Sequence, residues 1–274
     1  MKTTDYPSDL TDEQFAVIEP LLPKAKPGGR PRSVNLHDAV NGILYVNRTG
    51  CQWRALPKDY PPWSTCYDFF RKWRIDGTWQ RVNDALREQV RRKAGRKRSP
   101  RTASADSQSA KASGSGGESG HDAGKKVTGR KRHIVVDSLG LLLAVMVTAA
   151  SVHDARAAED LVALLPLSSL PRLRLIRADA AYATAALYEA VAWWGLRLEV
   201  VRRPEGAKGW VLLPKRWVVE RTFAWLGRYR RHSKEYERLP ESSEDMIRVS
   251  MIHLMARRLK PGPPQRPFRY RKAA

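Results

Sequence analysis

The stretch PKRWVVERTFAWLGRYRRHSKEY, residues 214–236, combines apolar residues at helical spacing with a strongly basic surface. Val219, Phe223 and Leu226 recur at i, i+4 and i+7, which predicts one helix across the stretch with a buried apolar stripe. Glu220 lies among lysines and arginines on this helix. A carboxylate in such a field is either an ion-pair partner or a metal ligand, and the stretch by itself favours the ion pair.

The residues around Glu220 favour a partner that carries phosphates. Ala224 and Gly227 share its helix face and leave room for a phosphate backbone to approach the carboxylate. Arg216 also shares this face. An adjacent face carries residues that could hold phosphates and stack on a base, namely Arg221, Trp225, Arg228 and His232. The alternative is a core tryptophan with solvated arginines, and the charge of the whole chain argues against it.

The chain is strongly basic throughout. Its 274 residues carry 50 Lys and Arg against 28 Asp and Glu, a formal charge of +22. This balance favours a polyanionic partner, nucleic acid before a membrane surface. No apolar run reaches transmembrane length and no signal peptide opens the chain, so we expect a cytoplasmic protein.

Residues 1–93 are expected to form a small helical domain that binds DNA. Helical apolar periods occur over residues 10–22, 34–48, 63–74 and 79–93. The third helix has an expected core stripe of Trp63, Tyr67, Phe70 and Trp73, and its other positions include Arg71, Lys72 and Arg74, which suit phosphates. A helix, a turn and a basic helix are compatible with a helix-turn-helix DNA reader, and a plain helical bundle fits equally well.

Two basic connections flank these helices. Residues 28–32 read GGRPR, in which Arg30 and Arg32 could enter an AT-rich minor groove, although an ordinary basic loop is an equal alternative. Residues 94–104 are expected to be a basic linker that follows phosphates.

Residues 105–259 are expected to form an α/β domain. Apolar and β-branched runs predict strands at residues 102–106, 131–136, 141–147, 173–176 and 196–201. Helices are expected at residues 155–165, 180–194, 214–236 and 241–259, which gives a layered α/β arrangement. Residues 107–130 are rich in Gly and Ser and predict a long loop whose basic end, Lys125, Lys126, Arg130, Lys131 and Arg132, faces DNA. Residues 260–274 are a basic, proline-rich tail.

Three carboxylates stand out in this domain. Asp106 ends the first expected strand, Asp179 follows the fourth, and Glu220 lies on a later helix. Oxygen ligands of this kind suit Mg²⁺ or Mn²⁺, and a pair of such ions supports phosphoryl transfer. Asp137 and Asp154 have local explanations, in a hairpin turn and as a helix cap.

Several segments carry the motifs of one known family. They are residues 105–109 (ADSQS) with Lys111, residues 122–127 (DAGKKV), residues 129–133 (GRKRH), residues 178–179 (AD) with Tyr182, residues 216–226 (RWVVERTFAWL), residues 10–14 (LTDEQ) and residues 52–57 (QWRALP). Through them the chain resembles the bacterial insertion-sequence DDE transposases of the family numbered five, over nearly its whole length.

The resemblance implies a fold, a site and partners. The fold is a ribonuclease H-like mixed five-stranded sheet with flanking helices, preceded by a helix-turn-helix-like domain. Asp106, Asp179 and Glu220 match the catalytic, metal-binding DDE triad, which would hold two Mg²⁺ ions that Mn²⁺ can replace. Arg216 matches the arginine four residues before the glutamate in the related YREK signature, whereas Leu213, Gly227 and Ala181 depart from the family pattern.

The implied function is transposition of an insertion sequence. The enzyme would bind terminal inverted repeats in double-stranded DNA, hydrolyse the element ends and join the 3′-OH ends to target DNA, as a homodimer associated with the nucleoid. Two alternatives remain open: a DNA-binding repressor derived from a transposase, and a metal-dependent nuclease without strand transfer.

Overall fold

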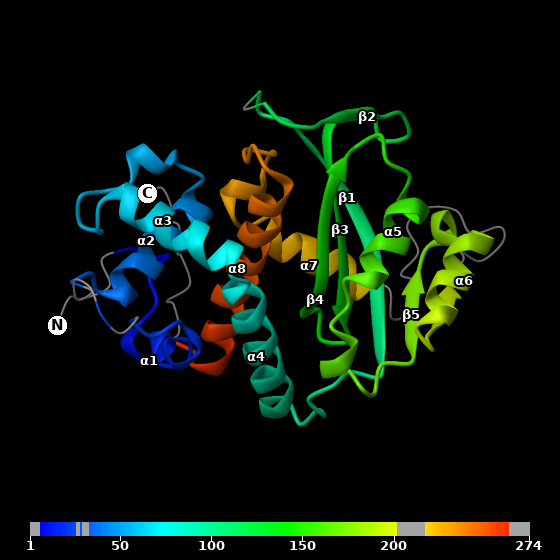
Figure 1. Ribbon diagram of the computed structural model, residues 1–274, viewed down its shortest axis with the longest axis horizontal. Helices are drawn as coiled ribbons and strands as arrows, with labels where there is room; N and C mark the ends of the chain where they lie inside the picture. The colour runs from blue at the N-terminus through cyan, green and yellow to red at the C-terminus, as the bar shows by residue number, and fades with distance from the viewer. Residues whose placement is uncertain (1–5, 26–27, 29–32, 115, 202–216, 263–274) are drawn as a thin grey trace, which may run out of the picture.

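The structure, a computed structural model, describes residues 6–25, 28, 33–114, 116–201 and 217–262 (Figure 1). Its centre is one mixed sheet of six strands. The strands are β1 (Thr102–Lys111), β2 (Gly120–Asp122), β3 (Val127–Asp137), β4 (Leu142–Ala149), β5 (Leu175–Ala178) and β6 (Arg197–Val200).

The strands pair in the spatial order β4-β3-β1-β5-β6, and β2 lies beside the first residues of β3. β1 is antiparallel to β3 and parallel to β5, and β5 is parallel to β6. The ribonuclease H-like α/β fold is therefore confirmed. The expected five strands are one too few, because β2 forms inside the segment that was interpreted as a loop.

Helices cover both faces of the sheet. α5 (Asp154–Ala163) and α6 (Ala185–Trp193) pack on the face that carries Ala103, Ala105 and Val135. α7 (Trp217–Leu226) and α8 (Pro240–Leu259) pack on the opposite face, which carries Ile134 and Val136. None of the helices among the described residues is both long and apolar enough to cross a membrane.

The N-terminal region folds around the same core as the second face of the sheet. Its helices are α1 (Asp12–Phe15), α2 (Leu36–Thr49), α3 (Trp63–Ile75) and α4 (Thr78–Lys93). Figure 1 shows α8 running between these helices and the sheet, and it packs against α4 on one side and β4 on the other. Apolar residues of α2, α3 and α4 join those of α7, α8 and the sheet in one continuous cluster. The N-terminal helices therefore share a hydrophobic core with the sheet.

Several expected boundaries shift. The first helix ends at Phe15 and is followed by a short 3-10 turn that contains Pro20, because proline cannot donate a backbone hydrogen bond. The expected helix at residues 180–194 is split, since a new helix begins at Ala185 and the Thr184 side chain caps it by accepting the Leu187 N–H. α7 ends at Leu226, ten residues earlier than expected.

Two further expectations change in the N-terminal half. Residues 102–104 of the expected linker belong to β1, where they pair with β5. α2 and α3 are joined by residues 50–62, much longer than the 3–4-residue turn of a helix-turn-helix unit. Within α3, Phe70 and Trp73 are buried as expected, but Trp63 and Tyr67 are 38% and 39% exposed and lie outside the core.

Half of the expected loop at residues 107–130 is strand. β1 continues to Lys111, which pairs with Gly129 on β3. The loop interpretation treated glycine as a source of flexibility, whereas two of these glycines are required by close packing. A β-carbon at Gly129 would overlap the Ala110 carbonyl oxygen on β1, and one at Gly120 would overlap the Ser151 hydroxyl. Backbone pairing thus orders a segment with few apolar residues.

We expect Gly129→Ala to lower the free energy of unfolding by about 1–3 kcal/mol, because overpacking at this site forces β1 and β3 apart. Gly124→Ala is the matched control, since a β-carbon there would lie 3.5 Å from Asp122 Oδ1, an ordinary van der Waals contact. Urea unfolding followed by circular dichroism measures both. Equal stabilities would contradict the close approach of the two strands.

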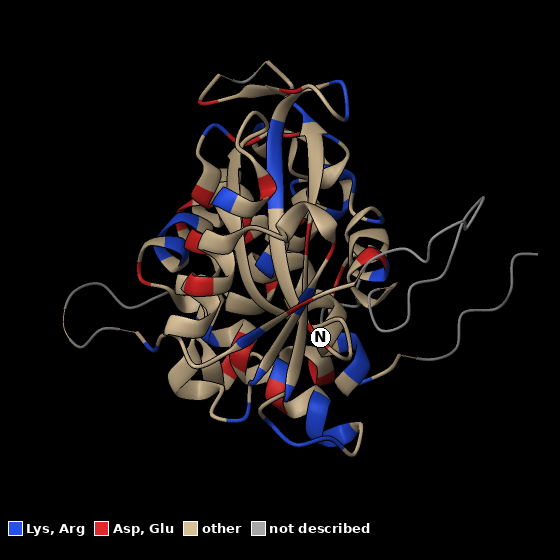
Figure 2. Cartoon of the chain, turned by 90° about the vertical axis from the view of Figure 1, so that its right-hand side faces the viewer, with Lys and Arg blue, Asp and Glu red and all other residues tan. Residues whose placement is uncertain are grey.

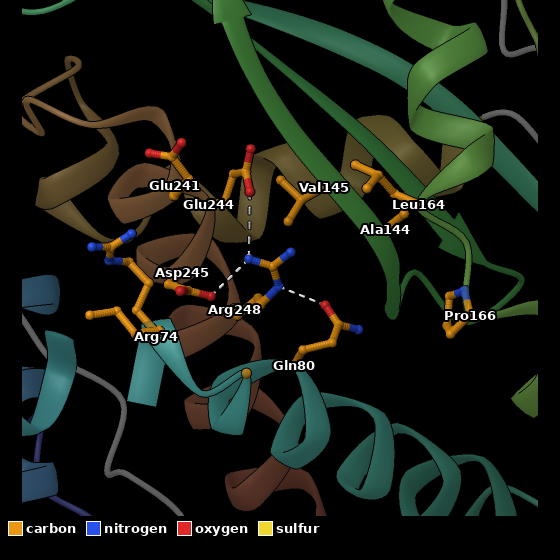
Figure 3. Close-up of a pocket in the computed structure, with 12 residues that line it drawn as sticks. Arg74, Gln80, Ala144, Val145, Leu164, Pro166, Glu241, Glu244, Asp245 and Arg248 are labelled. Carbon is orange, nitrogen blue, oxygen red and sulfur yellow. Dashed lines mark hydrogen bonds and ion pairs between the residues drawn. The ribbon is translucent and has the colours of Figure 1, made fainter. Parts of the chain in front are cut away.

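A pocket of about 470 Å³ lies where the N-terminal helices meet the sheet (Figure 3). Its walls come from the turn between α3 and α4, from β4 and from the start of α8. Figure 3 shows Arg248 at its centre, with Nη1 2.7 Å from Asp245 Oδ1 and Nε donating to Gln80 at 2.7 Å. Glu244 accepts a hydrogen bond from the Val147 N–H of β4 at 3.0 Å. Burial raises the pKa of Glu244 to about 7 and that of Asp245 to about 6.

Glu244 should make the protein less stable as pH rises. A carboxyl with a raised pKa in the native state favours folding while it is protonated, and this advantage is lost as pH rises from about 4.5 to about 7. Glu244→Gln keeps an acceptor for Val147 and removes the ionisation. We expect the fall in unfolding free energy between pH 5 and pH 8 to shrink by about 1–3 kcal/mol.

The neighbouring Glu241 provides the control for this experiment. Glu241→Gln also removes a carboxylate from the pocket, but this carboxylate is exposed to solvent. Denaturant unfolding at several pH values should leave the Glu241→Gln profile parallel to wild type. A parallel profile for Glu244→Gln as well would show that Glu244 ionises alike in the folded and unfolded chains.

Candidate functional site

Asp106 lies on β1 close to the point where its pairing with β5 ends. The last residue pair between these strands is Ser104 with Arg177. On the other side of β1, Asp106 pairs with Ile134 of β3, and the Ile134 side chain belongs to the core beneath α7. Paired residues of antiparallel strands share a face, so the carboxylate of Asp106 lies on the α7 face. The Ser107 N–H donates to its Oδ1 at 2.7 Å.

Asp179 directly follows β5. Ala178, the last residue of the strand, packs in the core on the α5 and α6 side. Because side chains alternate along a strand, Asp179 faces α7, and extending the register of β1 and β5 places it beside Asp106. Its Oδ1 accepts the Ala181 N–H at 2.9 Å and begins the short 3-10 turn Ala180–Tyr182.

Glu220 approaches from the helix layer. It lies in the first turn of α7, which packs across β1 and β3, and its side chain is exposed. Val219 and Phe223 bury the neighbouring side of this helix. The three expected carboxylates therefore come from a strand, a strand end and a helix, and the sheet directs the two aspartates to the face on which α7 packs.

These carboxylates do not form a closed metal site as they stand. Across the described ranges, no three Asp, Glu, His or Cys side chains lie close enough together to hold a metal ion. The donor set is still suitable, since all three are hard oxygen ligands on well-packed elements.

The positions of two residues near the aspartates, Tyr182 and Asp154, were not predicted from the sequence. The Tyr182 side chain is 1% exposed, and burial, followed by the charges of Asp106, Asp154 and Asp179, raises its pKa well above the ordinary value. Its hydroxyl group therefore lies near three aspartates. In the sequence, Tyr182 was recognised as part of a family motif, with no role assigned to it. That motif was the signal that could have drawn attention to this residue.

Asp154 was interpreted as a helix cap, but His153 is the cap of α5. The Asp154 carboxylate instead accepts the Ser107 hydroxyl at 2.8 Å and lies 3.1 Å from the Lys131 ammonium. Although burial opposes ionisation, these two partners hold the pKa of Asp154 below its usual value. No local pattern could reveal this, because Ser107 lies 47 residues away in the chain. The turn role expected of Asp137 is confirmed, as it accepts the N–H groups of Leu139 and Leu141.

Three basic residues expected to face DNA are buried instead. Arg130, Lys131 and Arg132 on β3 are at most 5% exposed. Arg130 donates to the carbonyls of Glu118, Glu237 and Arg238. The expectation that these residues face DNA is wrong because β3 is covered on both sides. An arginine on such a strand must find hydrogen-bond acceptors inside the protein.

Arg132 and Lys131 are bonded in the same way. Arg132 donates to the His232 and Lys234 carbonyls and lies 3.2 Å from the Glu235 carboxylate. Lys131 donates to the Val152 carbonyl at 2.9 Å. The two buried arginines therefore fix the segment between α7 and α8. His232 is also buried and bonds to Ser250 at 2.7 Å, which removes it from the expected DNA surface.

The remaining basic candidates are mostly exposed. Lys125 and Lys126 lie in the turn between β2 and β3, and Arg228 follows α7. On α3, Arg71 and Lys72 are exposed, whereas Arg74 is half-buried at the acidic pocket. Arg30, Arg32 and Arg216 lie outside the described residues.

Arg221 and Trp225 belong to an aromatic and cationic stack. The Arg221 guanidinium carbon lies 4.3 Å from the Trp217 ring centre and 4.7 Å from that of Trp225. Arg258 of α8 lies 4.2 Å from the same Trp225 ring. The indole of Trp225 is thus already engaged by two arginines, which counts against the expected stacking of a base on it.

The fold and the carboxylates on its α7 face define a class of protein. Residues 97–255, more than half of the chain, match the family of transposase DDE domains, and the chain belongs to that family. Residues 10–83 match a second description, a putative transposase of the IS4/5 family. The expected resemblance is therefore confirmed.

Two curated relatives come from Burkholderia cepacia. The putative transposase for insertion sequence element IS402 is 36% identical over 117 residues, 40% of this chain and 54% of the relative. The uncharacterized 16.2 kDa protein of insertion element IS402 is 38% identical over 90 residues, 30% of this chain and 60% of the relative. The chain thus spans little more than half the length of the curated relatives that it matches.

Proposed function

We propose that this protein is the transposase of an insertion sequence. It would bind the terminal inverted repeats of its element, hydrolyse the element ends and join the 3′-OH ends to target DNA. The observation that carries the proposal is the placement of Asp106, Asp179 and Glu220 on one side of a DDE-family sheet.

The three carboxylates would hold two Mg²⁺ ions, with Mn²⁺ as a substitute. When bound, the ions would activate the attacking oxygen and stabilise the leaving oxygen in phosphoryl transfer. The backbone bonds at Ser107 and Ala181 orient the carboxylates of Asp106 and Asp179 for this purpose. Cation binding would draw Glu220 closer to the two aspartates than it lies in the free chain.

Duplex DNA is the proposed partner, along a surface made by exposed basic residues. The proposed contacts are Arg71 and Lys72 on α3, Lys125 and Lys126 beside β3, and Arg228 after α7. Arg30, Arg32 and Arg216 are included from the sequence. A homodimer is the proposed assembly, because transposition brings two element ends together.

Two other functions predict different products. A repressor derived from a transposase would bind the ends without cutting them, and a simple nuclease would cut without joining. An assay with the element ends, a supercoiled target and Mg²⁺ distinguishes the three, since strand-transfer product forms only with a transposase.

We expect Asp106→Asn, Asp179→Asn and Glu220→Gln each to reduce end cleavage by at least about 10³-fold, because each removes a carboxylate that would bind a cation. End binding without metal should be retained. Asp160→Asn removes a carboxylate from the exposed side of α5 and should cleave normally. Normal cleavage by any one of the three variants would remove that residue from the proposed triad.

The exposed basic side of α3 should contribute two phosphate contacts. Replacing both Arg71 and Lys72 by Gln should lower the slope of log affinity against log salt by about 0.9 per lost contact. Arg197, exposed on β6 at the far side of the sheet, gives the control Arg197→Gln. Fluorescence anisotropy with a labelled repeat duplex measures the slopes. An unchanged slope in the double variant would mean that α3 does not face DNA.

A further inference from the structure

A second pocket, of about 440 Å³, opens at the side of α7. It lies where the end of α4, the turn between β3 and β4, α7 and the end of α8 meet. Val90, Ala94 and Leu139 form its apolar walls, and the indole of Trp225 forms another. The polar groups that enter it are the cations of Lys93, Arg221 and Arg258, and no acidic residue is among the described residues that line it.

The two guanidinium groups have donors that the protein does not use. The Arg258 guanidinium stacks on Trp225 and makes no hydrogen bond or ion pair with any residue in the described part of the chain. Arg221 donates from Nη2 to the Leu139 carbonyl at 3.1 Å, but its buried Nε has no partner among the described residues. Buried polar groups are normally hydrogen-bonded, so the buried Nε of Arg221 indicates a missing acceptor.

The local charge is also unbalanced. The nearby carboxylate of Asp137 is fully buried and already paired with Arg91. Burial, and then the charge of Arg221, lowers the pKa of Arg258, which agrees with two cations held close together away from water. Lys93 donates to the Arg258 and Leu259 carbonyls at the end of α8, and these bonds hold its ammonium group beside the pocket. An anion would compensate this charge.

Phosphate is the anion that fits this arrangement. The planar, forked donors of arginine match the oxygens of a phosphate group, and two arginines with one lysine give charge for a single phosphodiester. The pocket also continues into a basic surface, because Arg92, Lys97 and Arg98 at the end of α4 and after it are exposed. Figure 2 shows Lys and Arg gathered along the lower edge of the molecule, where Figure 1 places this end of α4. A row of cations beside a pocket suits a chain of phosphates.

We propose that the pocket bounded by Arg221, Trp225 and Arg258 binds a backbone phosphate of duplex DNA. This inference rests on the proposed DNA partner and adds a contact that lies apart from the carboxylates. At 100° per residue, Trp225 lies about 140° around α7 from Glu220. The phosphate in the pocket is therefore a different one from the phosphate that faces Glu220, and it positions the duplex on the other side of α7.

The test uses the full chain, a duplex of random sequence and no metal, so that its result does not depend on end recognition or cleavage. Arg258→Gln should lower the slope of log affinity against log salt by about 0.9, the value for one lost phosphate contact. Arg258→Lys keeps the charge and should keep the slope while weakening binding. Arg156→Gln on α5 removes the same charge from an exposed ion pair, and it should match wild type.

A second measurement on the wild-type chain avoids any variant that misfolds. Modification of arginines by a dicarbonyl reagent, read by mass spectrometry, should be suppressed at Arg258 when the duplex is bound. An unchanged slope for Arg258→Gln, or equal modification of Arg258 with and without duplex, would overturn the proposal. Pyrophosphate that protects Arg258 where the duplex does not would assign the pocket to a small anion and overturn the DNA contact as well. If the salt slopes and the protection of Arg258 are as expected but the wild-type chain does not cleave element ends, that result counts against the transposase proposal alone.

Discussion

The antiparallel pairing of β1 with β3 is the contact on which the rest of the structure depends. It runs from Ala103 opposite Asp137 to Lys111 opposite Gly129, and it fixes which face of the sheet Asp106 occupies. The same register directs Arg130 and Arg132 into the protein, where they hold the carbonyl groups of the segment that joins α7 to α8. Because that segment follows α7 directly, the pairing also constrains the helix that carries Glu220.

A second constraint is the position of α8. It contributes to the core beneath the sheet and to the core of the N-terminal helices, so the two regions are packed as one body. A surface on α3 and a surface beside β3 are thereby held in a fixed relation. For a protein that handles DNA, such rigidity would set the path of the duplex before it reaches the carboxylates.

The charge of +22 is used in two different ways. Arg91, Arg130 and Arg132 are buried and bonded, and they support the fold. Exposed residues such as Arg71 and Lys72 are not buried in this way, and they suit an external polyanion. Arg258 is intermediate, since it is half-buried against an indole with its donors unmet by the described residues. Net charge alone therefore overstates the surface available to DNA.

The sequence by itself determined the family and the α/β order, and it predicted where the three proposed carboxylates lie in the fold, because motifs and apolar periods are local properties of the chain. Asp106 at a strand, Asp179 after a strand and Glu220 on a helix were all predictable in this way. The tertiary structure alone decided which basic side chains are buried, as the GRKRH run at residues 129–133 illustrates. It also decided that half of residues 107–130 is strand, that Asp154 pairs with Lys131, and that Arg221 and Arg258 share a pocket. Each of these depends on contacts between residues far apart in the chain, and no periodicity within a segment records them.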